Sequence, residues 1–177
     1  TAATGGGNID ITGAATFTTT NANVGFATSG VDLANNGTTT INTGSGGGTV
    51  TFGAGLESNG GDNDALTITS GTGTVTFTGA IGATEELGGL TVNSTAGNAT
   101  ITFSSTIGDG GNAGVIGTTA IGGTASTAVN FNSTIYKFDG ATTITAAAGD
   151  TIDIGAAATF TTANDNITFA TGNIELA

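Results

Sequence analysis

The sequence predicts an all-β protein, a parallel β-solenoid of about seven coils with essentially no α-helix. Apolar residues occur in short alternating bursts about 7–9 residues apart, such as Ile-Asp-Ile at 9–11 and Val-Gly-Phe at 24–26. This alternation is typical of short strands with one buried face, and the Gly and Asn between the bursts are typical of turns. No segment keeps the apolar spacing of 3, 4 and 7 that an amphipathic helix requires.

One segment of the chain occurs twice. Residues 6–34 align without a gap with residues 149–177, at a constant offset of 143, and are identical at 17 of 29 positions. Most substitutions are mild, as where Val24 is replaced by Ile167. Because internal repetition indicates stacked repeats, we interpret the two segments as homologous coils of a single β-solenoid domain spanning 1–177. The match also suggests a possible tandem repeat with the period of that offset.

The chain between these segments divides into strands and turns. After a first coil at 8–34, alternation of apolar residues with Thr predicts strands at Thr38–Ile41, Thr49–Phe52, Ala65–Thr69, Thr74–Thr78, Leu90–Val92, Ala99–Phe103, Ala128–Phe131, Thr134–Phe138 and Thr142–Thr145. Residues 53–64 are expected to form a long loop, and Ala83–Leu87 is too short for more than one helical turn. Residues 104–127 are the weakest section, with four apolar anchors at Ile107, Val115, Ile116 and Ile121.

Parallel stacking is favoured over an antiparallel sandwich because hairpin signals are few. Asn36-Gly37 and Asp139-Gly140 are the candidates for hairpin turns. In a solenoid each strand lies on the equivalent strand of the next coil, so the nine Phe residues and the Thr residues are expected to stack in columns. At about 25 residues per coil and about 4.8 Å between strands, the rod is expected to be roughly 30–35 Å long.

Composition excludes several classes of function. The net charge is −12, yet only 8% of residues are charged, and Lys137 is the only cation. One cation cannot neutralise nucleic-acid phosphates or hold an anionic membrane surface, so no nucleic-acid partner is expected. No run of about 18 apolar residues occurs, so no membrane insertion is expected either. The start at Thr1, without Met or a signal sequence, suggests a processed chain or a window of a longer array.

The segment Gly73–Phe103 carries a recognisable pattern and reads GTVTFTGAIGATEELGGLTVNSTAGNATITF. It resembles the strand repeats of giant secreted bacterial surface proteins, the filamentous-haemagglutinin-like and autotransporter-associated β-strand-repeat proteins, which carry runs such as TVTFxGAxGxxxxLxxLTV. The positions that fit are Thr74, Val75, Thr76, Phe77, Gly79, Ala80, Gly82, Leu87, Leu90, Thr91 and Val92. The resemblance implies a right-handed parallel β-solenoid, an exported location and a structural or adhesive role, with no catalytic residues to transfer.

Catalysis is not expected, because the chain contains no His, no Cys and one Lys. Neither a Ser/His/Asp arrangement nor a Cys nucleophile can be built from such a chain. Two carboxylate groups remain, Glu85-Glu86 and Asp62-Asn63-Asp64, and we interpret both as solvated loop charges. A weak acidic polysaccharide lyase or hydrolase is the alternative, although such enzymes usually also present Arg, Lys or aromatic platforms.

Ligand and modification candidates are few. Asp62 and Asp64 lie in a stretch similar to a calcium-binding nonapeptide repeat and are weak candidates for Ca²⁺, but the stretch occurs once. No cofactor and no other metal is expected. Lys137 is interpreted as an exposed strand residue, with an amide cross-link to a nearby Asp or Asn as the alternative. Asn-x-Ser/Thr sequons make N-glycosylation candidates of Asn36, Asn93, Asn98, Asn132 and Asn166.

The two ends of the chain carry the functional prediction. Neither end offers a charged, helical or Pro-bearing cap, and unprotected strand edges favour the addition of further strands. Because a head-to-tail contact that does not close makes a filament, we predict an extracellular or cell-surface structural subunit that stacks on itself into a β-rich filament or surface fibre. The alternatives are an adhesin rod segment of a giant surface protein and an ice-binding β-solenoid.

Ice binding would use the Thr-x-Thr motifs at 16–18, 38–40, 49–51, 67–69, 74–76 and 100–102. A flat, regular Thr ladder on one solenoid face can order water, whereas the ordinary β-propensity of Thr explains the same motifs without a ligand. We expect the motifs not to recur at a constant position in the coil, which disfavours ice binding.

Overall fold

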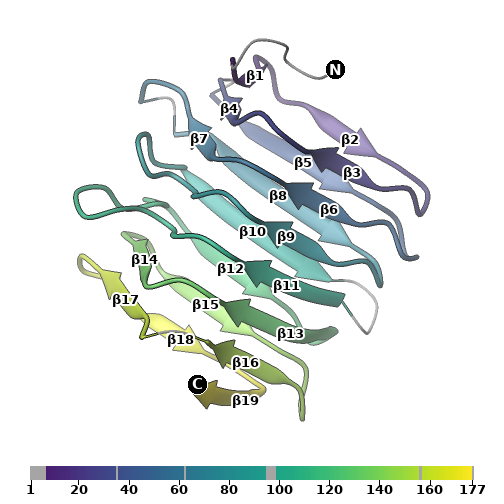
Figure 1. Cartoon of the computed structure of the whole chain (residues 1–177), viewed down its shortest axis with the longest axis vertical. Coiled ribbons are helices and arrows are strands. Elements are labelled where there is room, and N and C mark those ends of the chain that lie inside the picture. The colour runs from purple at the N-terminus through teal and green to yellow at the C-terminus, as the bar shows by residue number, and fades with distance from the viewer. Residues whose placement is uncertain (1–6, 35, 62, 95–98, 156, 177) are drawn as a thin grey trace.

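Short parallel strands make up the computed structural model shown in Figure 1. It describes residues 7–34, 36–61, 63–94, 99–155 and 157–176. These residues form 19 strands and no helix, and every strand pair among them is parallel. The predicted all-β solenoid is therefore confirmed. The described residues contain no helix that is long and apolar enough to cross a membrane.

The strands are divided among three faces. The first long sheet contains, in stacking order, β2 (Thr16–Thr18), β5 (Thr38–Asn42), β8 (Ala65–Ser70), β10 (Gly89–Ser94), β12 (Thr119–Gly122), β15 (Thr142–Thr145) and β18 (Ile167–Phe169). The second long sheet contains β3 (Val24–Phe26), β6 (Val50–Phe52), β9 (Val75–Phe77), β11 (Ala99–Phe103), β13 (Ser126–Phe131), β16 (Thr151–Ile154) and β19 (Asn173–Leu176).

The third face is less regular. It contains β1 (Ile9–Ile11), β4 (Val31–Leu33) and β7 (Leu56–Ser58) at one end, and β14 (Ile135–Phe138) and β17 (Thr159–Thr162) at the other. Isolated parallel bridges through Ile81 and Ile107 join β7 to β14, and a second column of bridges leads from Leu87 through Val115 to β14. The stack of coils is therefore continuous on this face as well.

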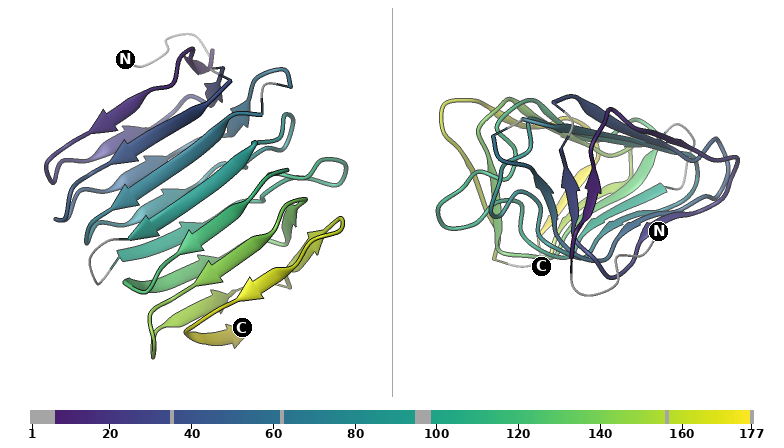
Figure 2. Two further views of the ribbon diagram at one scale, coloured as in Figure 1. Left: turned by 180° about the vertical axis from the view of Figure 1, so that it is seen from behind. Right: turned by 90° about the horizontal axis from the view of Figure 1, so that it is seen from above.

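The chain visits the third face, the first long sheet and the second long sheet in turn, around one shared interior (Figure 2). Seven strands stack in each long sheet, so the chain makes about six turns between the first and the last, close to the seven coils predicted. The coils differ in length. On the third face the step from Ile9 to its register partner Val31 is shorter than the step from Ile107 to Tyr136. Because the strands keep their register, the difference lies in the loops.

Aromatic rings stack through the interior, as the sequence predicts. Ring centroids 5.0–5.3 Å apart join five side chains at equivalent positions of the second long sheet, Phe26, Phe52, Phe77, Phe103 and Phe131. The first long sheet has an inward column that is aliphatic in the middle and aromatic at both ends, formed by Phe17, Ile41, Ile68, Val92, Ile121, Ile144 and Phe169. Alternation thus places these columns inside and the intervening residues outside, so side-chain burial and backbone pairing select the same register. Not every Thr is outward, because Thr39, Thr119 and Thr142 of the first long sheet are buried.

Two corners show why Gly separates the strands. A Cβ at Gly73 would overlap the carbonyl group of Gly48 in the coil beside it. At another corner, a Cβ at Gly53 would overlap the carbonyl group of Ala27. Coils about 4.8 Å apart leave no space for a side chain where two backbones meet in this way, so these positions require Gly.

Two strands were not predicted. Residues 53–64, expected to form a loop, contain β7, and the weak tract at 104–127 contains β12. Each of these strands carries one large apolar residue, Leu56 in β7 and Ile121 in β12, and each is at most 1% exposed. A single apolar residue gives no alternation to read, so the two strands become visible only when the neighbouring coils supply their partners.

One smaller expectation was also wrong. Ile116, expected to anchor the weak tract, is 37% exposed, whereas Val115 beside it is fully buried. Residues Ala83–Leu87 form no helical turn. Leu87 instead pairs with Val115 in a parallel bridge, because burial of its side chain between coils outweighs a local helical preference.

The repeated segment spans four strands, which is one coil and the first strand of the next. β1 pairs with β4, and β16 pairs with β19, by the same step along the chain, as in Ile9 with Val31 and Ile152 with Ile174. The first copy starts and ends on the third face, whereas the second starts and ends in the second long sheet. The offset between the copies is therefore not a whole number of turns, and the second copy is rotated by one face relative to the first.

Candidate interaction surfaces

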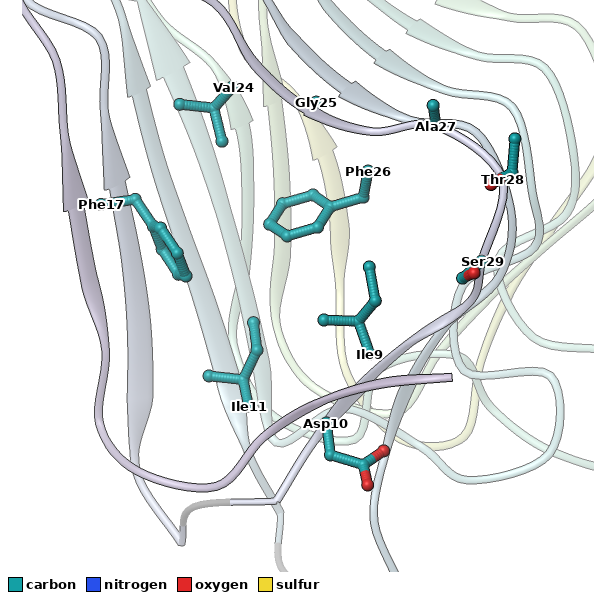
Figure 3. Close-up of a pocket in the computed structure, with 10 residues that line it drawn as sticks. All are labelled: Ile9, Asp10, Ile11, Phe17, Val24, Gly25, Phe26, Ala27, Thr28 and Ser29. Carbon is teal, nitrogen blue, oxygen red and sulfur yellow. The ribbon is translucent and has the colours of Figure 1, made fainter. Parts of the chain in front are cut away.

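The N-terminal end of the solenoid opens into its interior. A cavity of about 520 Å³ lies there, and its apolar lining comes from β1, β2 and β3 through Ile9, Ile11, Phe17, Val24 and Phe26 (Figure 3). Phe17 and Phe26 meet edge to face, with ring centroids 6.0 Å apart. Within the part of the chain that the structure describes, no strand pairs with the outer edges of β1, β2 or β3. Ile9, Phe17 and Val24 are only partly buried at this end, where the edges of their strands have no partner among the described strands.

The C-terminal end is similarly open. Ile174 is 50% exposed and Leu176 is 77% exposed, although both continue apolar columns of the second long sheet. Phe160 and Phe169 pack edge to face at 5.6 Å and are only partly buried. Among the described strands, none lies beyond β17, β18 and β19. The first and last described strands of the stack thus both carry apolar side chains that are only partly covered.

Carboxylates line up on the third face. Asp32 and Glu57 are register neighbours on β4 and β7. The side-chain amide of Asn8 donates to both Asp32 oxygens, at 2.9 and 2.8 Å. Glu57 accepts the backbone N–H groups of Thr84 at 3.1 Å and Glu85 at 3.0 Å. Burial raises the pKa of Glu57 above its ordinary value, and these hydrogen bonds offset part of that effect.

The outer surface of the first long sheet carries a threonine column. Register partners on its seven strands are Thr16, Thr40, Thr67, Thr91, Ala120, Thr143 and Thr168. All of these residues are exposed or partly exposed. The Thr-x-Thr motifs themselves do not keep one position in the coil, as expected, because those at 16–18, 38–40 and 67–69 lie on this sheet and those at 49–51, 74–76 and 100–102 reach the second. Single Thr residues nevertheless form a column. Coil lengths vary, which hides the alignment in the sequence, but a Thr directly before the inward apolar residue of six of the seven strands would have revealed it.

The second long sheet presents a different outer column. It begins with Gly25, continues through Thr51, Thr76 and Thr102, and changes to Asn130, Asp153 and Glu175. Its register shifts between Ala99 and Thr100. The Asn130 side chain donates to the Thr102 hydroxyl at 3.3 Å. This face is therefore less regular than the first, and it is charged at one end.

The calcium candidates do not form a site. Asp64 is fully buried, and its carboxylate accepts the Gly37 backbone N–H and the Ser58 hydroxyl, both at 3.1 Å. Asp62 lies outside the described residues. In the described ranges, no group of three or more His, Cys, Asp or Glu side chains could hold a metal ion. Asp64 already has protein partners, so it gives the calcium hypothesis no support.

The other charged candidates stay apart from one another. Glu85 and Glu86 are partly exposed, and the Glu85 backbone supports Glu57 rather than a substrate site. Lys137 is partly exposed on β14. The pKa of Asp109 is lowered by backbone N–H groups and, to a smaller extent, by the Lys137 charge, so the cation lies near an acidic loop. The cavity at the N-terminal end has one carboxylate in its lining, that of Asp10, so it does not offer a carboxylate pair.

The predicted glycosylation sites have different settings. Asn36, Asn132 and Asn166 are exposed in turns, and Asn93 is partly exposed within β10. Asn36 has a positive φ of 51°, which suits a tight turn. Asn98 lies outside the described residues. Modification of these side chains remains a prediction.

No family model, curated protein or solved structure matches this chain. The geometry therefore defines a class rather than a family. The described residues form a parallel β-solenoid whose first and last strands have no partner on their outer edges among the described strands, with one long sheet whose strands combine a constant register with the absence of charge. The resemblance at Gly73–Phe103 to secreted surface-protein repeats stays a prediction.

Proposed function

We propose that the protein is an extracellular structural subunit that adds end to end onto further copies of itself and forms a β-rich filament or surface fibre. The observation that carries this proposal is the pair of open ends, where apolar side chains and strand edges face outward together. Such edges add strands unless charge, Pro or a covering loop blocks them. A head-to-tail contact between different ends repeats without closing.

The strand order suggests how one copy would continue another. β19 belongs to the second long sheet, and the next face along the path of the chain is the third face, where β1 lies. Continuation of the spiral places β1 of the second copy on β17, β2 on β18 and β3 on β19. Every edge strand then gains one parallel partner, and the rise of about 4.8 Å per turn is maintained.

In this register the apolar columns continue across the junction. The pairs brought together are Phe169 with Phe17, Ile174 with Val24, and Leu176 with Phe26. The last of these pairs lies at the mouth of the N-terminal cavity. An apolar side chain of this size contributes about 1.5–3 kcal/mol when it passes from exposed to fully buried. Burial of Ile174 and Leu176, the two most exposed of these side chains, therefore favours association.

The same register creates no new pair of opposed charges of like sign. Glu175 comes opposite Gly25, and Asp10 comes opposite Thr161. A junction rotated by one face would place β19 on β1 and bring Glu175 opposite Asp10, and directly opposed like charges are destabilising. The net charge of −12 is carried mainly by the sides and loops of the rod, which keeps separate fibres apart.

The extracellular or cell-surface location is part of the proposal. The resemblance of Gly73–Phe103 to the repeats of secreted surface proteins supports it. The low share of charged residues, 8%, also suits coils that must stack closely without repelling one another.

Engineered disulfides test the junction directly, because the chain has no native Cys. Thr16 and Thr168 lie on the first and seventh strands of the first long sheet, about 29 Å apart in one molecule at about 4.8 Å per strand. Across the proposed junction they are neighbours, within the Cα separation of about 4.4–6.8 Å that a disulfide needs. Thr16→Cys with Thr168→Cys should therefore give a ladder of linear oligomers under mild oxidation.

The matched control combines Gly25→Cys with Thr168→Cys. A Cβ at Gly25 meets no neighbouring atom, so the substitution fits. In the proposed register these two positions lie on different faces, and little cross-linking is expected. Equal ladders from both pairs would show unspecific collision, and no ladder from the first pair at high concentration would refute the proposal.

A further inference from the structure

One face of the solenoid carries no charge on its strands. The seven strands of the first long sheet contain no Asp, Glu, Lys or Arg, although the chain has 13 acidic residues and one basic residue. The strands of the third face carry Asp10, Asp32 and Glu57, and those of the second long sheet carry Asp153 and Glu175. The charged strand residues thus lie on the other two faces and not on the first long sheet.

The same face is regular. Its six strand pairs show no register shift, in contrast to the shift at Ala99/Thr100 in the second long sheet. The inward residues Ile41, Ile68 and Val92 are fully buried and hold the strands in place. Thr is β-branched and restricted at χ1, so the outward hydroxyl and methyl groups have few orientations. Neighbouring members of the column are about 4.8 Å apart, and Ala120 of β12 is the one member that is not Thr.

A second polar column makes the pattern two-dimensional. Two residues further along four consecutive strands lie the outward register partners Thr18, Asn42, Thr69 and Asn93. Alternate residues of a strand are about 6.6–6.8 Å apart. Hydroxyl, methyl and amide groups therefore form a lattice with one repeat across the strands and another along them.

A lattice of this kind matches an ordered layer of water. Each threonine hydroxyl can donate and accept a hydrogen bond, as a water molecule in ice does. The methyl groups between the hydroxyls restrict the orientation of first-shell water. A charged side chain would instead orient water around itself and break the layer, which gives the absence of charge a physical reason.

We propose that the outer surface of the first long sheet, with the threonine column at its centre, binds the surface of ice. The ordinary β-propensity of Thr accounts for Thr on both long sheets, but a Thr on six of seven strands, the constant register and the absence of charge coincide on this one. The inference does not depend on end-to-end association. In the proposed junction, however, Thr168 meets Thr16, so a filament would extend the column.

The test uses ice itself as the ligand. Thermal hysteresis, and the fraction of protein taken up into slowly grown ice, are measured for the native chain and two variants. Thr67→Lys places a charge at the centre of the column. Thr76→Lys is the matched control, because Thr76 is in the same coil, is also partly exposed, and is also flanked by Thr on both neighbouring strands. Circular dichroism and the melting temperature confirm that both variants fold.

The native chain and Thr76→Lys should show hysteresis and uptake into ice, and Thr67→Lys should lose most of both. The proposal is overturned if the native chain shows neither effect, if hysteresis survives Thr67→Lys, or if both variants lose it equally. Retention on microcrystalline cellulose or chitin that Thr67→Lys abolishes, without activity on ice, would assign the face to a polysaccharide surface and would also overturn it.

Discussion

Residues 6–34 and 149–177 are identical at 17 of 29 positions but have different surroundings. Leu33, on β4 of the first copy, is fully buried because β7 lies beyond it. Leu176, at the equivalent position on β19, is 77% exposed, and no described strand lies beyond it. The same side chain in the same local sequence is therefore buried or exposed according to the next coil, which is the behaviour expected of a stacked repeat.

The two copies also differ in the face that they occupy. The step from β1 to β16 is five turns and two thirds of another, because β1 lies on the third face and β16 in the second long sheet. An array with this period would rotate each unit by one face, and three units would restore the starting face. The sequence of this repeat therefore does not determine which face its strands occupy, because a strand on any face needs only alternating apolar residues.

The largest expected effect compares Leu33→Ala with Leu176→Ala. Removal of the buried Leu33 side chain should lower the free energy of unfolding by about 2–5 kcal/mol. Removal of the exposed Leu176 side chain should change it by less than about 0.5 kcal/mol. Urea denaturation followed by circular dichroism, on dilute monomeric protein, measures both. Equal losses would contradict the view that the next coil decides burial.

A second comparison uses Phe26 and Phe169, which occupy the same position in the two copies of the repeated segment. Phe26 stacks on Phe52 at 5.0 Å and is 9% exposed, whereas Phe169 makes an edge contact with Phe160 at 5.6 Å and is less buried. Phe26→Ala should cost about 3 kcal/mol, and Phe169→Ala about 1–2 kcal/mol.

Both residues lie at the proposed junction, so each substitution should also raise the concentration at which sedimentation detects end-to-end oligomers. A larger loss of stability for Phe169→Ala than for Phe26→Ala would show that the C-terminal coil is better packed than the geometry indicates.

The smallest expected effect concerns Glu57 on β7. β7 covers β4 of the first copy, whereas no described strand covers β19 of the second. The pKa of Glu57 is raised by burial, so folding favours the protonated form. This contribution to stability is complete below the unfolded-state pKa and is lost as pH rises through the folded-state pKa. The urea midpoint should therefore increase as pH falls from about 7 to about 4.5, and Glu57→Gln should reduce that increase. Equal pH dependence in the two proteins would contradict the assignment.

Alternation of Ile, Val and Phe with Thr was sufficient to predict the solenoid and the Phe stack, because these side chains must share one face of a strand. Other features depend on neighbouring coils. β7 and β12 each have one large apolar residue and no alternation of their own. The threonine column was missed because coils of unequal length have no constant period in the sequence. The rotation of the second copy by one face could be read only from the register.

Electron cryomicroscopy of concentrated protein tests the central claim most directly. If copies continue one another's coils, filaments should show strands stacked about 4.8 Å apart along the axis and one copy every seven coils, a rise of about 34 Å. Discrete monomers at every concentration, or filaments in which the strands of neighbouring copies do not stack in one continuous series, would contradict it.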